Sequence, residues 1–184
     1  MANISVLSLD QACKESRAVY DEFNRRMQFP APPNFITTQG HSSHVARGTW
    51  ELIKNVLVSG DIERWKKEII FVAISHERNC RYCLAAHTAC CRMLGVDVEL
   101  FVGNWQAMPD PVLRDMILFA MKTARDPQGL TSDDYDVLRA YGLSQSQIME
   151  LISMAALAVY ANIIADATAM EADKVFETVG PKVA

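Results

Sequence analysis

The chain has 184 residues, of which 50% are hydrophobic and 22% charged, and its formal net charge is −4 at pH 7. This composition is typical of a soluble globular protein, and we expect residues 1–184 to form a single domain with a substantial core. No run of lysine and arginine is long enough to grip phosphates, which argues against a nucleic-acid partner. The first residues lack a secretory signal, and the longest apolar run, 151–165, is shorter than the roughly 20 residues of a membrane span. We therefore expect a cytoplasmic protein with no membrane partner.

The N-terminal part of the chain predicts one amphipathic helix followed by a break. Residues at spacings of three and four would form one face of this helix. They are Leu9, Cys13, Ser16, Tyr20, Phe23 and Met27. Ser8 and Gln11 have the spacing of a capping box at its start. The segment PAPPNF, residues 30–35, then ends the helix, because proline cannot continue it.

The middle of the chain predicts three further helices. The first covers about 43–58 and stops at Gly60, and the second begins near residue 61. The second contains a β-branched run, 69–74, which we interpret as helix because its flanks favour helix and no partner strand is predicted elsewhere. The third covers about 80–94, with Asn79 as the expected N-cap and Gly95 as the stop signal.

The C-terminal half also predicts only helices. We expect a short helix over 97–104 and longer ones over 110–125, 132–141 and 144–170, each beginning at an Asp or Ser that can act as a cap. The last helix is apolar on nearly all sides, so it should be the central core helix or should also pack against another subunit. The sequence thus predicts an all-α fold of about eight helices.

Four of the five cysteines lie in the stretch RNCRYCLAAHTACC, residues 78–91. In a reducing cytosol such a cluster is more often catalytic or metal-binding than a structural disulfide. On a helical wheel four of its side chains share one face. These are Cys80, Cys83, His87 and Cys91. Cys90 falls towards the edge of that face. We interpret Cys13, Cys90 and Cys91 as packing residues, with an auxiliary thiol as the alternative for Cys91 because it shares the face.

The two cysteines of the C-x-x-C pair stand at the predicted start of a helix. Cys80 and Cys83 are one turn apart, so they can form a disulfide with little movement of the backbone. The positive end of the helix dipole favours a thiolate at this place, and Arg78 and Arg81 could add to that field. The thiolate is the reactive form of cysteine, which makes this pair the candidate redox centre.

Two further residues could move protons at this centre. His87 stands four residues after Cys83 on the same face, within reach as a general base or as part of a proton relay. Glu68 lies in an apolar stretch of the preceding helix, where a carboxylate needs a polar partner. If the two helices form a hairpin, Glu68 could face the thiols, although periodicity alone leaves this open.

Two other interpretations of the cluster remain. The cysteines could be inert core residues, since free cysteine is often buried. Alternatively, Cys80, Cys83 and His87 could bind zinc, with a fourth ligand from Cys91, Glu68 or His76. Against zinc, no second ligand pair with finger-like spacing is present. We expect no bound metal or cofactor.

The pattern E-IIFVAISHERN-C-RY-C-LAA-H, residues 68–87, resembles the signature of the alkyl hydroperoxidase D (AhpD)-like proteins of the carboxymuconolactone decarboxylase superfamily. That signature has a glutamate, a C-x-x-C pair and a histidine four residues later. Residues 107–168, AMPDPVLRDMILFAMKTARDPQGLTSDDYDVLRAYGLSQSQIMELISMAALAVYANIIADAT, are similar to the C-terminal half of the peroxidase-related branch of this family.

The resemblance implies an oligomeric all-α protein, a trimer or a hexamer, that acts as an antioxidant dithiol peroxidase. It implies that Cys83 attacks the peroxide and that Cys80 resolves the sulfenic acid as a disulfide. Glu68 and His87 would form the relay that deprotonates Cys83. The partners would be a peroxide and a dithiol reductant of the lipoamide or thioredoxin kind, with no bound cofactor.

This chain departs from the family pattern at one position of the motif. AhpD itself often has a histidine between the two cysteines, where this chain has Tyr82. The lactone decarboxylases of the superfamily generally lack the cysteine pair, so the pair argues against decarboxylation. An alternative function is that of a thiol–disulfide oxidoreductase or redox sensor, which would use the same cysteines without needing Glu68.

Overall fold

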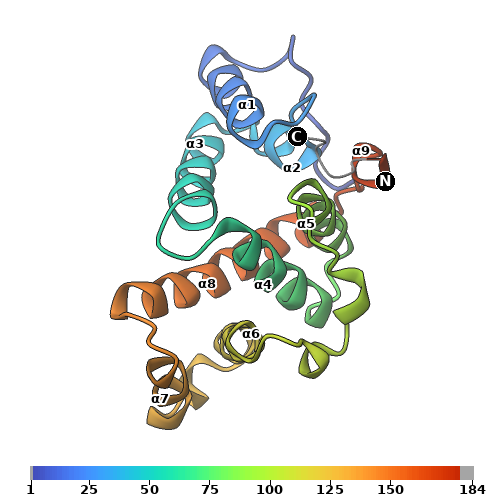
Figure 1. Cartoon of the computed structure of the whole chain (residues 1–184). Coiled ribbons are helices and arrows are strands. Elements are labelled where there is room, and N and C mark those ends of the chain that lie inside the picture. The colour runs from blue at the N-terminus through green and yellow to red at the C-terminus, as the bar shows by residue number, and fades with distance from the viewer. Residues whose placement is uncertain (1, 179–184) are drawn as a thin grey trace.

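The computed structural model describes residues 2–178, and within this range it contains helices and no strands, as predicted (Figure 1). The α-helices are α1 (Lys14–Met27), α2 (Asn34–Gln39), α3 (Ser43–Leu52), α4 (Arg64–Glu77), α5 (Arg81–Met93), α6 (Pro111–Arg125), α7 (Ser132–Ala140), α8 (Gln145–Ala167) and α9 (Val175–Thr178). A π-helix, η1 (Ile53–Val58), continues α3. Short 3-10 turns are η2 (Glu99–Phe101), η3 (Trp105–Ala107) and η4 (Pro127–Gly129).

The long helix α8 is the centre of the fold. It packs against α4, α5 and α6, and α4 and α5 form a closely packed hairpin beside it. Helices α1 to α3 lie on one side of this group and α7 on the other (Figure 1). By length and composition α8 could cross a membrane, but 50% of its most apolar window is buried in the bundle. This is the setting of a core helix, which was one of the two roles predicted for it.

Several helix ends follow the predicted capping chemistry. Ser144 and Gln147 form the expected capping box, in which each backbone N–H donates to the other's side chain, at 2.9 and 3.1 Å. Asp110 caps α6 by accepting from the backbone N–H groups of Val112 and Leu113. The segment 69–74 is helical and buried, as we inferred from its flanks.

At four places the structure differs from the prediction made from the sequence. The first helix begins at Lys14 rather than near Leu9, because Ser8 and Gln11 close a separate turn instead of a capping box on the helix. The short helices α2 and α9 were not predicted, and α2 directly follows the prolines that we took only as a break. The helix predicted from residue 132 has Thr131 as its cap.

The turn between α4 and α5 also differs from the prediction, and this affects the site. Asn79 is not the N-cap of α5; it has φ +57° and makes the left-handed turn that ends α4. Cys80 takes the N-cap position, with an extended backbone. Cys80 therefore precedes the helix, and Cys83 lies in its first turn.

Candidate active site

The two cysteines of the C-x-x-C pair are free and almost completely buried at the start of α5. Hydrogen bonding to Cys80 and burial raise the pKa of Cys83 well above the usual value, whereas the side chain of Asn162 acts to lower it. The sequence suggested instead a thiolate favoured by Arg78 and Arg81. Both arginines are exposed in the structure. The resting Cys83 is thus a thiol, and it needs a base to react.

Glu68 and His87 form a buried acid–imidazole pair. Glu68, on α4, is fully buried, and its Oε2 accepts a 2.6 Å hydrogen bond from Nδ1 of His87 on α5. Its other oxygen, Oε1, accepts a 3.0 Å bond from Nε of Arg64. Burial alone would raise the pKa of Glu68, but His87 and Arg64 outweigh it and hold that pKa below the usual value.

The contacts of His87 fix which ring nitrogen is available as a base. Because Glu68 is ionised, Nδ1 of His87 carries the proton that it donates, and Nε2 keeps a lone pair. The imidazole stacks on Phe71 with ring centroids 3.5 Å apart, which sets the plane of the ring. The predicted hairpin of two helices therefore does bring Glu68 to His87.

An apolar cavity of about 60 Å³ connects His87 with Cys83, since both residues line it. Its walls come from α1, α2, η1, α4, α5, α8 and α9. Six aromatic side chains belong to the lining: Phe23, Phe29, Phe35, Phe71, Tyr82 and Phe176. Among residues 2–178 no hydrogen bond joins His87 to Cys83 directly, so proton transfer between them would pass through a water or a substrate in the cavity.

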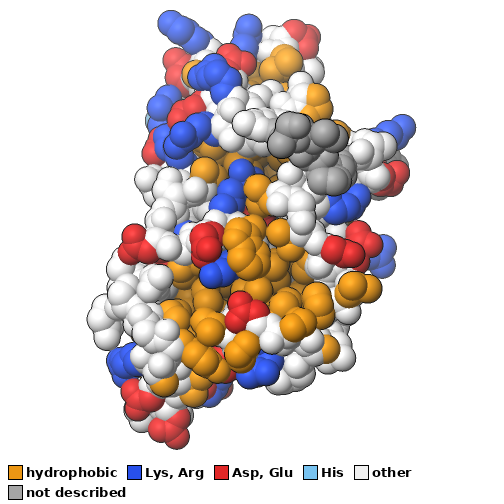
Figure 2. Space-filling view, viewed as in Figure 1, with side chains coloured by type: hydrophobic (Ala, Val, Ile, Leu, Met, Phe, Trp, Pro, Cys, Tyr) orange, Lys and Arg blue, Asp and Glu red, His pale blue; other side chains and the backbone are white. Residues whose placement is uncertain are grey.

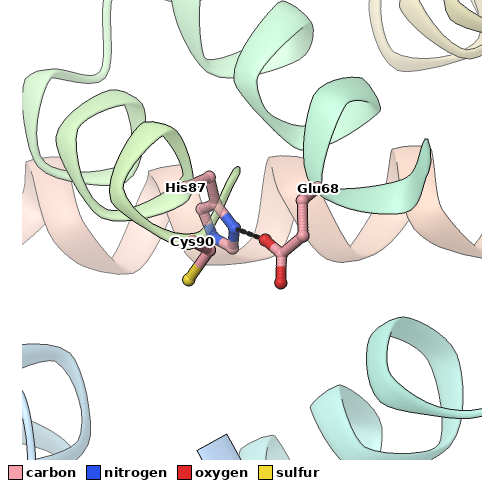
Figure 3. A group of neighbouring side chains, drawn as sticks. All are labelled: Glu68, His87 and Cys90. Atoms are coloured by element: carbon pink, nitrogen blue, oxygen red, sulfur yellow. Dashed lines mark hydrogen bonds and ion pairs between the residues drawn. The ribbon is translucent and has the colours of Figure 1, made fainter. Parts of the chain in front are cut away.

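The structure places Cys90, rather than Cys91, beside the acid–imidazole pair. The ligand atoms of Glu68, His87 and Cys90 all lie within 4.8 Å of one another (Figure 3). Cys90 lines the cavity, while Cys91 is buried outside the lining. The wheel failed because it counted Cys80, which precedes the helix, as part of the face, and this moved the centre of that face towards Cys91. Measured from Cys83, Cys90 is about 20° away and Cys91 about 80°. The zinc ligand set suggested by the sequence does not form a cluster within the described residues.

Two residues that the sequence analysis did not select also support the site. Arg64 stands four residues before Glu68, a spacing from which the ion pair could have been inferred. Asn162 is fully buried on α8 and donates a 3.0 Å bond from Nδ2 to Oγ of Ser75. Its effect on Cys83 depends on how α8 packs against α5, which sequence periodicity does not reveal.

Tyr82 lies between the two cysteines in sequence but its hydroxyl does not join the relay. The hydroxyl donates a 2.8 Å hydrogen bond to Asp173 and accepts a 3.0 Å bond from the backbone N–H of Phe35. Its ring packs edge-on against Phe176. Tyr82 therefore ties α5 to α2 and to the segment before α9, which form one wall of the cavity.

Comparisons with known proteins give a match in structure. No protein-family model matches the sequence, and no curated protein matches it either. A crystal structure of an alkylhydroperoxidase AhpD core, an uncharacterized peroxidase-related protein from Ralstonia eutropha JMP134, has a TM-score of 0.86 over 95% of this chain and 94% of that chain, at 22% identity. The chain has the AhpD fold.

Two further solved structures share this fold. An uncharacterized peroxidase-related protein from Silicibacter sp. TM1040 has a TM-score of 0.85 at 23% identity, over 95% of this chain and 93% of that chain. A cysteine variant of the debrominase Bmp8, in complex with 2,3,4-tribromopyrrole, has a TM-score of 0.80 at 19% identity, over 96% and 94%. The AhpD fold predicted from the sequence is confirmed, and the debrominase shows that this fold serves more than one chemistry.

Proposed function

We propose that this protein is an enzyme that reduces organic hydroperoxides with its C-x-x-C thiols. The observation that carries the proposal is the position of Cys83, which opens into an apolar cavity shared with His87, while Cys80 lies behind it as the N-cap of α5. Of the two cysteines of the pair, Cys83 is thus the one that a substrate in the cavity can reach. Cys80 is the neighbouring thiol that can resolve the product.

The proposed reaction gives a role to both cysteines of the pair and to the Glu68–His87 pair. His87, held by Glu68, accepts the proton of Cys83 through a water or through the substrate. The thiolate attacks the outer peroxide oxygen, the O–O bond breaks, and the alcohol leaves with a proton, so that Cys83 becomes a sulfenic acid. Cys80 then attacks that sulfur, water leaves, and a disulfide forms. A dithiol reductant, lipoamide-like or thioredoxin-like, takes the oxidising equivalents and restores both thiols.

The raised pKa of Cys83 fits a thiol that reacts only when its base is in place. A general base near the thiol can remove the proton during the reaction, although the resting group is protonated. The apolar walls exclude water, which strengthens the hydrogen bonds around the relay. They also favour an organic hydroperoxide over a small polar oxidant.

Replacing Glu68 by Gln distinguishes the peroxidase from a thiol–disulfide oxidoreductase or redox sensor. The variant keeps the shape of the side chain but loses the charge that orients His87. We expect peroxide consumption with a dithiol donor to fall by about 10²–10⁴-fold, the range for a lost acid–base function. Exchange with a small aromatic disulfide should persist. Equal loss of both activities, in a folded variant, would contradict the assignment of the relay.

A second candidate function is reductive dehalogenation of a small aromatic compound. It is favoured by the debrominase with the same fold and by the aromatic lining of the cavity in this chain. The two thiols would supply the two electrons: hydrogen replaces the halogen on the ring, halide leaves, and Cys80 and Cys83 form a disulfide. Release of bromide from 2,3,4-tribromopyrrole by the reduced protein, dependent on Cys83, would select this function over the peroxidase.

We also propose that the protein is a homo-oligomer and that it is located in the cytoplasm. A homo-oligomer, a trimer or a hexamer, would bury the apolar side chains that α8 leaves exposed, Met149 and Ile163. A cytoplasmic location would keep the cysteine pair supplied with dithiol reductants.

A further inference from the structure

The cluster of Glu68, His87 and Cys90 presents three different metal-ligating groups, and two of its members, His87 and Cys90, line the cavity. A carboxylate oxygen, an imidazole nitrogen and a thiol sulfur lie within 4.8 Å of one another. Figure 3 shows the three side chains that carry them. Two come from α5 and one from α4, the most tightly packed pair of helices in the described part of the chain. The reaction proposed above uses Glu68 and His87, and it leaves Cys90 without a role.

We propose that Glu68, His87 and Cys90 form a binding site for a thiophilic divalent cation, with Zn²⁺ as the representative ion, and that this ion inhibits the enzyme. One sulfur, one nitrogen and one oxygen ligand suit Zn²⁺ better than hard cations, which prefer oxygen alone. Three protein ligands leave the fourth position of a tetrahedral ion free. Because His87 and Cys90 line the cavity, that position faces the cavity.

The geometry needs only a small adjustment. Typical zinc–ligand distances place tetrahedral donor atoms about 3.4–3.6 Å apart. If the ion binds Nδ1 of His87, the proton of Nδ1 moves to Nε2 of the same ring, and the 2.6 Å contact between Glu68 and His87 must lengthen by about 0.8 Å. The sulfur of Cys90 must approach by roughly 1 Å. The second oxygen of Glu68 stays bonded to Arg64, which would orient the carboxylate from outside the ligand set.

The net charge of the cluster predicts which ligand would take the fourth position of the ion and how binding would depend on pH. In the metal-free protein the negative charge of Glu68 and the positive charge of Arg64 balance each other. The ion adds two positive charges, and Cys90 offsets one of them when its thiol ionises. One positive charge then remains, which favours a hydroxide or another small anion at the fourth position. Binding should therefore release a proton and strengthen as the pH rises.

The expected consequence for catalysis rests on the proposed peroxidase function. An ion that holds Glu68 and His87 removes the base for Cys83, so Zn²⁺ should inhibit peroxide turnover. Cys90→Ser should lose this inhibition, which is measured as the rate of the variant with Zn²⁺ relative to its own metal-free rate. The binding itself is measured without any substrate, so a protein that binds the ion but consumes no peroxide would refute the proposed function alone.

The test uses the reduced, metal-free full-length protein. It is titrated with Zn²⁺ by calorimetry and with Co²⁺ as a spectroscopic probe, because a thiolate ligand gives Co²⁺ a charge-transfer band. We expect one ion per chain. Cys90→Ser should abolish the band and weaken binding at least tenfold, whereas Cys91→Ser, the matched neighbour outside the cavity lining, should keep both.

Variants of the C-x-x-C pair test whether the ion binds through the thiol of Cys90 or through those of Cys80 and Cys83. The proposed site survives Cys80→Ser and Cys83→Ser. A band that these variants abolish and Cys90→Ser retains would overturn the proposal, as would the lack of one bound ion per chain. If Cys90→Ser does not fold, as judged by circular dichroism, His87→Gln provides the same comparison, and unchanged binding in that variant would equally overturn the site.

Discussion

The reactivity of Cys83 depends on two neighbours, Cys80 and Asn162, and on the burial of its thiol, which act in different directions. The hydrogen bond with Cys80 and the burial of the thiol raise its pKa, and Asn162 lowers it. The helix dipole, which the sequence suggested as an influence at this position, favours the thiolate. Cys80 thus has two roles in this account: it keeps the resting Cys83 protonated and it later resolves the oxidised sulfur.

Cys80→Ala removes the largest cause of the raised pKa, so the pKa of Cys83 should fall. Because Cys83 ionises above its usual value in the wild type, its thiolate fraction at pH 8 should be larger in the variant. The ultraviolet absorbance of the thiolate, followed against pH, should therefore show its midpoint at a lower pH than in the wild type. Cys91→Ala serves as the control. An unchanged or higher midpoint in Cys80→Ala would be inconsistent with this environment.

At the scale of elements, the cavity depends on contacts that hold its walls together. Tyr82 connects α5 to the backbone of α2 and to Asp173, just before α9. On the opposite wall, Lys67 of α4 has a completely buried side chain that donates to the carbonyl groups of Val56 and Ser59 and pairs with Glu150 of α8 at 2.6 Å. These contacts fix the C-terminal end of η1, which lines the cavity.

Tyr82→Phe should lower the free energy of unfolding by about 1–3 kcal/mol, because it leaves Asp173 and the backbone N–H of Phe35 short of one partner each. Urea denaturation measures this loss. The single-turnover oxidation of the cysteine pair should stay within a few-fold of the wild type, since the hydroxyl faces away from the relay. A folded variant whose thiols no longer react with peroxide would show that Tyr82 takes part in the chemistry.

Lys67→Met should lower the free energy of unfolding by about 3–5 kcal/mol, the range found when one partner of a buried ion pair is removed. The neighbouring Lys66→Met is the matched control. Lys66 makes a partly exposed ion pair with Glu63 and a cation–π contact with the ring of Trp65. Losing the exposed ion pair should lower the free energy of unfolding by less than about 1 kcal/mol. Thermal or urea unfolding of the two variants provides the comparison. Equal effects would mean that the Lys67 contacts do not hold η1 in place.

At the scale of the whole molecule, the all-α fold and most helices could be predicted because their periodicity and caps are local signals. The helices α2 and α9, with six and four residues, carry too little periodicity. They depend on tertiary contacts such as the bonds from the backbone N–H of Asn34 to Asp173. Glu68 and His87 could be selected from the motif, but the place of Cys90 required knowing where α5 begins.

The assembly is also a prediction at this scale. Figure 2, in the same view as Figure 1, shows hydrophobic side chains gathered on the face of the molecule where α4, α6 and α8 lie, with acidic groups among them. Met149 and Ile163 of α8 are 61% and 55% exposed in the single chain. We expect light scattering to give the mass of a trimer or a hexamer, and Ile163→Asp to shift the protein towards smaller species. A monomeric wild type would contradict this prediction.

The central claim is that Cys83 and Cys80 act together on a peroxide that reaches the cavity. The most direct test mixes the reduced protein with one equivalent of an organic hydroperoxide and counts free thiols over time. The account predicts the loss of two thiols per chain, located by peptide mapping as a disulfide between Cys80 and Cys83, and no such loss in Cys83→Ser. Thiols that stay reduced with hydroperoxide, but are oxidised by a disulfide reagent, would contradict it.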